Sequence, residues 1–272
     1  MKTVYCKSLL IVFGLFLMNN SCFSQNDKHN YLTVTTMHLN TDLENPSRDE
    51  WKALEKEYFD KVTMKNELIL GSNVVTHYFT ADNTEIIFVT LFENWESINK
   101  AWDREQEIIK QVWPDEKLRK AFFEKRNKYY DSHHSDEIYS TMPGEKILAQ
   151  KADKELVYYV RKASFAYPKD GTEKEFTDLS KQLYDALTSK NEYLKAYYPY
   201  SHAWGSNSTD FVEVYVVESL ASLEKAFERD DELFNAQWKD EKSRDDFNKK
   251  LGRYFTKTHS DYIYRSVVGL QK

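Results

Sequence analysis

The chain has 272 residues, a net charge of −6 with neutral histidines, and an aromatic content of 15%. No cluster of lysine and arginine interleaved with aromatic residues occurs, so the composition argues against a nucleic-acid partner. Both cysteines, Cys6 and Cys22, lie near the N-terminus. Residues 25–272 therefore have no thiol for a disulfide, a structural zinc ion or nucleophilic catalysis.

The N-terminus has the pattern of a signal peptide. Two lysines precede an apolar run at 9–18, and Cys22 and Ser24 place small residues before a cleavage point. We expect cleavage before Gln25 and export to the periplasm or the medium; the alternative is a lipoprotein anchored through Cys22. The apolar run is about half of the roughly 20 residues that span a bilayer, so no membrane span is expected.

The rest of the chain is an internal duplication. The segment His134–Tyr139 returns 125 positions later as His259–Tyr264, and at this offset 46–140 aligns with 171–265 without a gap. About 30 of the 95 aligned pairs are identical, which is far above chance. The expected domains are a signal peptide at 1–24, a first repeat at 25–143, a linker at 144–154 and a second repeat at 155–272.

The same elements are predicted in both copies. Period-two runs rich in Val, Thr and Tyr indicate strands, and apolar stripes at helical spacing indicate helices. In copy one these are a strand at 31–39, a helix at 51–62, strands at 69–80 and 85–93, a helical region at 98–129 interrupted near Pro114, and a strand ending near 142. In copy two they are a strand at 156–165, a helix at 176–187, strands at 194–205 and 210–218, a helical region at 223–254, and a strand ending near 267.

Two short sequence features that occur in both copies have a structural interpretation. Asp115 and Asp240 are predicted N-caps of the second part of each helical region. The identical Lys-Asn-Glu of 65–67 and 190–192 is interpreted as a solvated helix end.

The third strand of each copy has two unlike faces. Ile87, Val89 and Leu91 alternate with a mixed set that includes Phe88, and in copy two the mixed set includes Tyr215. We expect the aliphatic face to pack on the helices and the mixed face to border a pocket.

The order β-α-β-β-α-β in each copy is the ferredoxin-like plan. Two such units with an interrupted second helical region resemble the dimeric α/β barrel superfamily, which includes antibiotic-monooxygenase-type and chlorite-dismutase-like proteins. The resemblance implies an α+β fold in which two tandem ferredoxin-like repeats face each other as an intramolecular dimeric α/β barrel. It also implies that 194–205, which contains Pro199, is a sheet edge. The sequence leaves open a monomer or a homo-oligomer.

Histidine and aromatic residues are the candidate ligand-binding set. His77 shares a strand face with Phe79, and its counterpart His202 shares one with Tyr200 and Trp204. A histidine with a pKa near 6.5 can serve as a general base after modest desolvation. The structural alternative is a partly buried histidine that is hydrogen-bonded to a neighbouring backbone group.

A second candidate set is the repeated His-Ser-Asp element. His134 and His259 precede Asp136 and Asp261 by two positions at the start of a strand, so each pair can point to one side. The alternative places each histidine at a helix C-terminus, where the macrodipole favours a cation. No metal is expected, because a third ligand would have to come from elsewhere, such as Glu93.

Two classes of function remain. The first is an exported small-molecule-binding protein with an aromatic and histidine-lined pocket between the sheets and no cofactor. The second is an enzyme of the same fold, cofactor-free or haem-dependent, which uses a histidine as base or ligand. The resemblance implies that a haem would need an axial ligand, for which His77, His202, His134 and His259 are the candidates. A scaffold without a pocket is a third, weaker option.

Overall fold

A computed structural model describes residues 29–272, so the predicted signal peptide and Cys22 lie outside the described residues. The first half contains β1 (Tyr31–Leu39), α1 (Arg48–Lys61), a 3₁₀ turn (Thr63–Lys65), β2 (Ile69–Phe79), β3 (Glu85–Phe92), α2 (Trp95–Val112), α3 (Glu116–Asn127) and β4 (Tyr130–Thr141). The second half contains β5 (Val157–Phe165), α4 (Glu173–Leu183), a π-helical turn (Tyr184–Thr188), β6 (Ala196–Trp204), β7 (Asp210–Val217), α5 (Leu220–Gln237), α6 (Glu241–Gly252) and β8 (Phe255–Gln271).

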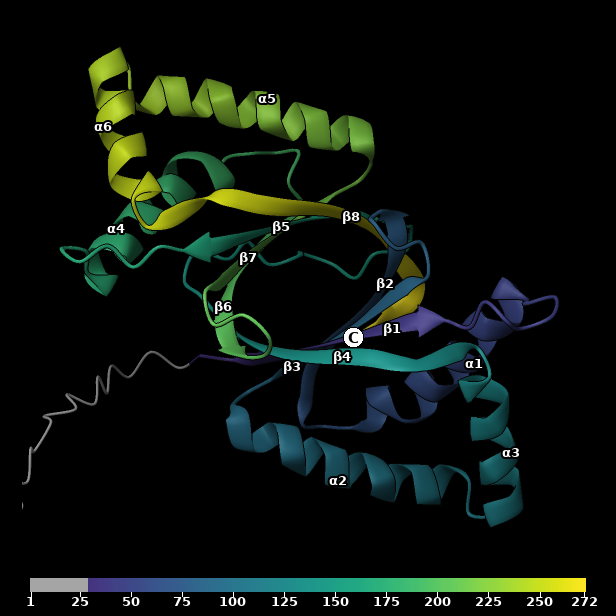
Figure 1. Cartoon of the computed structure of the whole chain (residues 1–272). Coiled ribbons are helices and arrows are strands. Elements are labelled where there is room, and N and C mark those ends of the chain that lie inside the picture. Colours follow the sequence, from purple (N-terminus) through teal and green to yellow (C-terminus); the bar gives the residue numbers. More distant parts are fainter. Residues whose placement is uncertain (1–28) are drawn as a thin grey trace, which may run out of the picture.

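All eight strands of the described chain form one closed antiparallel barrel. Their order is β1-β3-β2-β8-β5-β7-β6-β4. The strands of each half stay together, and the halves join at two seams, where β2 pairs with β8 and β4 pairs with β6. Helices α1 to α3 lie outside the barrel on one side and α4 to α6 on the opposite side (Figure 1). The prediction of an α+β fold is confirmed.

Pairing at the seams contradicts the expectation of a sheet edge at Pro199. Strand β6 pairs with β7 on one side and with β4 on the other, so the prediction of a free sheet edge at Pro199 is wrong. The N–H and C=O of a residue in an antiparallel strand point to the same neighbour. The carbonyl of Pro199 accepts from Met142 N at 3.1 Å, one residue after β4 ends. The missing N–H therefore faces the end of β4, where a proline is tolerated.

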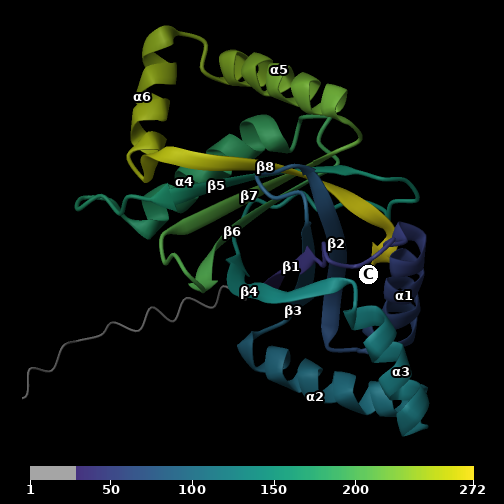
Figure 2. The same ribbon diagram turned by 45° about the vertical axis from the view of Figure 1, so that its right-hand side comes forward.

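The last strand is longer than its predicted end near Val267. Its register against β2 shifts between Ser266 and Gln271, where Gly269 has a φ of 93°. The chain bends there, and Val267 and Leu270 enter the core beneath α1. The C-terminus accordingly lies beside α1 (Figure 2). Helices α3 and α6 begin as expected, because Asp115 and Asp240 are their N-caps. No helix among residues 29–272 is long and apolar enough to cross a membrane.

The repeated Lys-Asn-Glu is solvated at its lysine and glutamate, as predicted, but not at its asparagine, because Asn66 and Asn191 are both 0% exposed. Asn66 Nδ2 donates to Ala101 O at 2.8 Å, and its Oδ1 accepts from Leu68 N at 3.2 Å. Asn191 makes the equivalent bonds in the second half. Each asparagine thus ties the chain leaving the first helix to the backbone of α2 or α5. A helix end next to another helix is buried, which a local sequence pattern does not indicate.

We predict that Asn66→Ala and Asn191→Ala each lower the free energy of unfolding by about 3 kcal/mol. Each substitution removes a buried amide that ties two segments together and leaves the backbone N–H of Leu68 or Tyr193 without its partner. Urea unfolding of each variant measures the effect. Asn83→Ala, in the exposed β2–β3 turn, serves as the control and should change stability by less than about 0.5 kcal/mol. A change that small for Asn66→Ala would contradict the structural role.

Candidate functional site

The aliphatic face of β3 lies inside the barrel, which reverses the predicted assignment of faces. Ile87, Val89 and Leu91 line the interior. Phe88 packs with Trp51 and Leu54 of α1, and Tyr215 packs against α5. Period two shows which residues share a face, but which face is inside depends on how the strands close. The prediction that the mixed face borders a pocket between the two sheets is therefore wrong.

A cavity of about 790 Å³ lies inside the barrel, which we call the central cavity. Its middle is a ring of four valines from paired strands, Val34 opposite Val89 and Val160 opposite Val214. Charged and tyrosine side chains line the two ends. This composition, apolar walls with a few polar groups, is typical of small-molecule sites.

One end of the central cavity holds a charged cluster at the β4–β6 seam. Lys162 Nζ lies 2.6 Å from Asp210 Oδ2 and 3.3 Å from Glu137 Oε2. Tyr139 donates its hydroxyl to Glu137 Oε2 at 2.5 Å. Asp210 is only 2% exposed and also accepts from Asn207 Nδ2 at 2.6 Å. The cluster joins the two halves of the chain, since Glu137 and Tyr139 belong to the first and Lys162 and Asp210 to the second.

The charges in this cluster stabilise one another. Burial alone would lower the pKa of Lys162, but the hydrogen bond with Asp210 and the two carboxylates raise it above its ordinary value. Burial would raise the pKa of Glu137, but the Tyr139 hydroxyl and Lys162 hold it below its ordinary value. Lysine and glutamate thus both stay charged at neutral pH, and burial together with Glu137 raises the pKa of Tyr139, which stays protonated.

A related pair stands across the barrel. Tyr264 donates its hydroxyl to Glu85 Oε2 at 3.2 Å, as Tyr139 does to Glu137, and both residues line the central cavity. Burial, then the charge of Glu85, raise the pKa of Tyr264, so this phenol is a donor at neutral pH.

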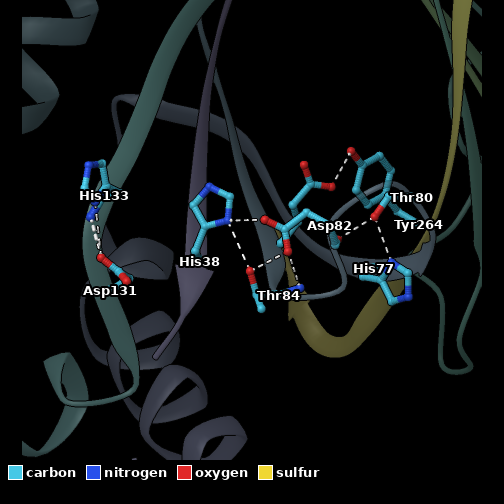
Figure 3. Close-up of polar contacts among 9 residues, drawn as sticks. His38, His77, Thr80, Asp82, Thr84, Asp131, His133 and Tyr264 are labelled. Carbon is cyan, nitrogen blue, oxygen red and sulfur yellow. Dashed lines mark hydrogen bonds and ion pairs between the residues drawn. The ribbon is translucent and has the colours of Figure 1, made fainter. Parts of the chain in front are cut away.

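The β2–β3 turn organises two histidines near this end (Figure 3). His38 lines the central cavity, and its Nδ1 lies 3.0 Å from Asp82 Oδ2 and 3.2 Å from Thr84 Oγ1. His77 points to the turn instead, with Nδ1 2.7 Å from Thr80 Oγ1. The hydroxyl of Thr80 in turn donates to Asp82 O at 2.6 Å. His77 is therefore held by the turn and does not line the central cavity.

The other residues of the first predicted set do not lie together in one site. Tyr200 lines the central cavity, and its ring stacks on Tyr198 with a centroid distance of 6.4 Å. Phe79 and Trp204 end their strands at 56% and 66% exposure. His202 is half-buried, and its Nε2 has no hydrogen-bond partner in the described part of the chain. A ligand-binding role for Phe79, Trp204 and His202 stays a prediction, and no cavity described for residues 29–272 supports it.

The repeated His-Ser-Asp elements lie inside strands. His134 Nε2 is 3.3 Å from Asp136 Oδ2, and His259 Nδ1 is 2.9 Å from Asp261 Oδ2, so each pair does share a side. The alternative of a helix C-terminus is wrong, because β4 and β8 begin four residues before each histidine. Among residues 29–272, no three His, Asp or Glu side chains gather to hold a metal ion.

A second cavity, which we call the outer cavity, lies between the barrel wall and helices α4 and α6. It has a volume of about 580 Å³, and Phe176, Phe211 and Leu251 form part of its wall. His259 borders it together with Arg161. The counterpart His134 borders none of the cavities described for residues 29–272.

Sequence reasoning missed the charged cluster, although one signal was present. Lys162 has the same strand parity as Tyr158 and Val160, so a cation stands on the face that those residues place inside. A lysine on an apolar face requires a partner. Asp210 could not be identified as that partner, because its proximity depends on the pairing of β5 with β7.

Comparisons with known proteins identify the fold. No family model matches the sequence, and no curated protein matches it. A proposed monooxygenase of Fusobacterium nucleatum has a similar structure, with 12% identity over 88% of this chain and 93% of that chain and a TM-score of 0.55. A chlorite dismutase variant from Candidatus Nitrospira defluvii has 11% identity over 88% and 91% and a TM-score of 0.51. This chain therefore shares the overall fold of these two proteins.

We predict that Lys162→Met lowers the free energy of unfolding by about 3 kcal/mol, because it leaves Asp210 buried without its cation. Denaturant unfolding at neutral pH measures this loss. Acid should reduce the difference from the wild type, since protonation of the carboxylates removes the uncompensated charge. Lys174→Met removes an exposed i,i+4 pair with Asp178 and should cost less than about 0.5 kcal/mol. Equal effects of the two substitutions would contradict the role of the cluster.

Proposed function

We propose that the protein binds a small apolar molecule inside its barrel. The observation that carries this proposal is the central cavity of about 790 Å³ with its ring of four valines. Protein interiors are packed to the density of organic crystals, so an opening of this size is not a packing defect. Its volume falls within the range of ligand sites, roughly 300 to 1,000 Å³.

Filling the central cavity tests this proposal. Val89→Phe adds a ring where the side chain faces open space, so the free energy of unfolding should change by less than about 1.5 kcal/mol. The variant should nevertheless lose binding of N-phenyl-1-naphthylamine, an apolar dye that fluoresces when it leaves water. Fluorescence titration of wild type and variant is the measurement.

Ile86→Phe is the matched control. Ile86 is on the same strand but faces the helices, where it is 1% exposed in the core with Trp51 and Leu54. An extra ring in this packed core should destabilise the protein by about 1 to 3 kcal/mol and leave dye binding intact. Dye binding that survives Val89→Phe would rule out the central cavity as the site.

We also infer that the two halves are tandem ferredoxin-like repeats, so that one chain does what a homodimer does in single-copy relatives. Three observations support this: the duplication in the sequence, the matching strand orders β4-β1-β3-β2 and β8-β5-β7-β6, and the two equivalent seams. Comparable losses of stability in Asn66→Ala and Asn191→Ala are expected on this view.

A haem-dependent enzyme is the second candidate, and one observation favours it. His259 borders the outer cavity, and its Nδ1 is engaged by Asp261, so its Nε2 could ligate a haem iron. Arg161 and Lys257 border the same cavity and could pair with propionate groups. These residues fit a haem, which when bound would supply redox chemistry at its iron. The chain's own contribution would be to hold and orient it against the apolar wall.

Haem titration of the apo-protein distinguishes the two candidates. If the second holds, the wild type should give a Soret band shifted from that of free haem, and His259→Ala should lose it. His134→Ala is the matched control, because it removes the same element from the other half without touching the outer cavity. A titration that matches free haem in the wild type would exclude this candidate and leave the apolar-ligand proposal unaffected.

A further inference from the structure

The end of the central cavity next to the linker contains a tyrosine hydroxyl that has no protein partner among the described residues. Tyr200 is 9% exposed and lines the central cavity. Unlike Tyr139 and Tyr264, it donates no hydrogen bond to any residue among 29–272. Polar groups in a protein interior nearly always have a hydrogen-bond partner. The Tyr200 hydroxyl is therefore placed to bond with a molecule in the cavity.

Two further tyrosines surround this position. The Tyr198 ring stacks on Tyr200 at an interplanar angle of 17°, and its hydroxyl accepts from Leu148 N at 3.0 Å, which fixes the linker over this end. Tyr158 on β5 lines the same end. Burial raises the pKa of Tyr200, and the neighbouring Tyr198 and Glu145 raise it further, so its hydroxyl stays protonated. Electron-rich faces of several tyrosines attract a cation.

One carboxylate at this end has no counter-ion. Glu145 is exposed, lines the central cavity and makes no ion pair or hydrogen bond with the described residues. Lys272 also lines this end, but its Nζ donates to Asn66 O at 2.7 Å. Lys151 lines the cavity as well, but its ammonium group lies 5.7 Å from the Phe59 ring. Neither lysine forms an ion pair with Glu145.

The opposite end differs in this respect, because Lys162 already neutralises Glu137 and Asp210 there. A cationic ligand group would compete with a lysine at that end. At the linker end the same group would meet a carboxylate without a counter-ion.

We propose that the central cavity takes an organic cation, with its apolar chain along the valine ring and its protonated amine against the Tyr200 hydroxyl and the Glu145 carboxylate. This proposal rests on the proposed binding function and adds the chemical class of the ligand. A primary alkylamine is protonated at neutral pH, as lysine is. Charge-assisted hydrogen bonds are roughly twice as strong as neutral ones, so an amine should bind more tightly than the matching alcohol.

Decylamine and decanol test the proposal as a pair, since they share the chain and differ in charge. Each is titrated into the full chain loaded with N-phenyl-1-naphthylamine, and dye displacement gives its affinity. Decylamine should bind about tenfold more tightly than decanol. Glu145→Gln should remove most of this preference and change decanol affinity less than about twofold, because it keeps the shape and removes the charge. Tyr200→Phe should weaken decylamine about tenfold.

Two variants serve as controls. Glu228→Gln removes a charge from the exposed face of α5 and should leave the preference for decylamine unchanged. Tyr262→Phe removes a different hydroxyl from the lining of the cavity and should affect both ligands alike. Equal affinities in the wild type, or a preference that survives Glu145→Gln, would overturn the cation proposal while decanol binding upholds the apolar site. Failure of both compounds to displace the dye would overturn both proposals.

Discussion

Closure of the barrel is the constraint on which the rest of the structure depends. Two pairs of strands, β2 with β8 and β4 with β6, convert two four-stranded sheets into one wall without a free edge. Closure decides the role of each strand face at once, because alternate residues then point either to an enclosed space or to the helices. Pro199 shows how local this constraint is. It has no backbone N–H to donate, yet it lies in β6, which is paired on both sides. The proline is accommodated because the neighbouring strand β4 ends opposite it.

The helical layers outside this wall carry different side chains at matched positions in the two halves. In the first half, Arg126 Nη2 donates to Glu55 Oε2 at 2.9 Å, and Tyr130 donates to Glu55 Oε1 at 2.7 Å. The counterparts of Arg126 and Glu55 in the second half are Leu251 and Ser180, which border the outer cavity. A buried ion pair is rarely more stable than well-packed apolar side chains. The second half has the same strand order without this ion pair, so the fold does not require it.

The sequence predicted the parts of the structure that depend on local patterns. Every strand and helix was placed within a few residues, and Asp115 capped its helix as expected. The errors concern relations between elements. Period two placed Val89 and Leu91 on one face but could not tell that closure turns this face inward. Asn66 was interpreted as solvated because nothing local reveals that α2 covers it. The same distinction applies to the site. Strand parity identified Tyr200, whereas the Lys162 cluster forms only through the pairing of strands that are distant in sequence.

A single chain permits a cavity that a homodimer could not build. Two identical subunits about a two-fold axis must place the same side chain on both sides of a shared cavity. Here the valine ring keeps that symmetry, but Tyr198 and Tyr200 stand opposite the matched positions Asn73 and Val75 in the first half. The two sides of the cavity therefore differ at these positions, although equivalent seams close the wall on both sides. An asymmetric cavity gives a bound molecule one preferred orientation, because its polar end finds partners on one side only, and the unpartnered Tyr200 hydroxyl marks that side.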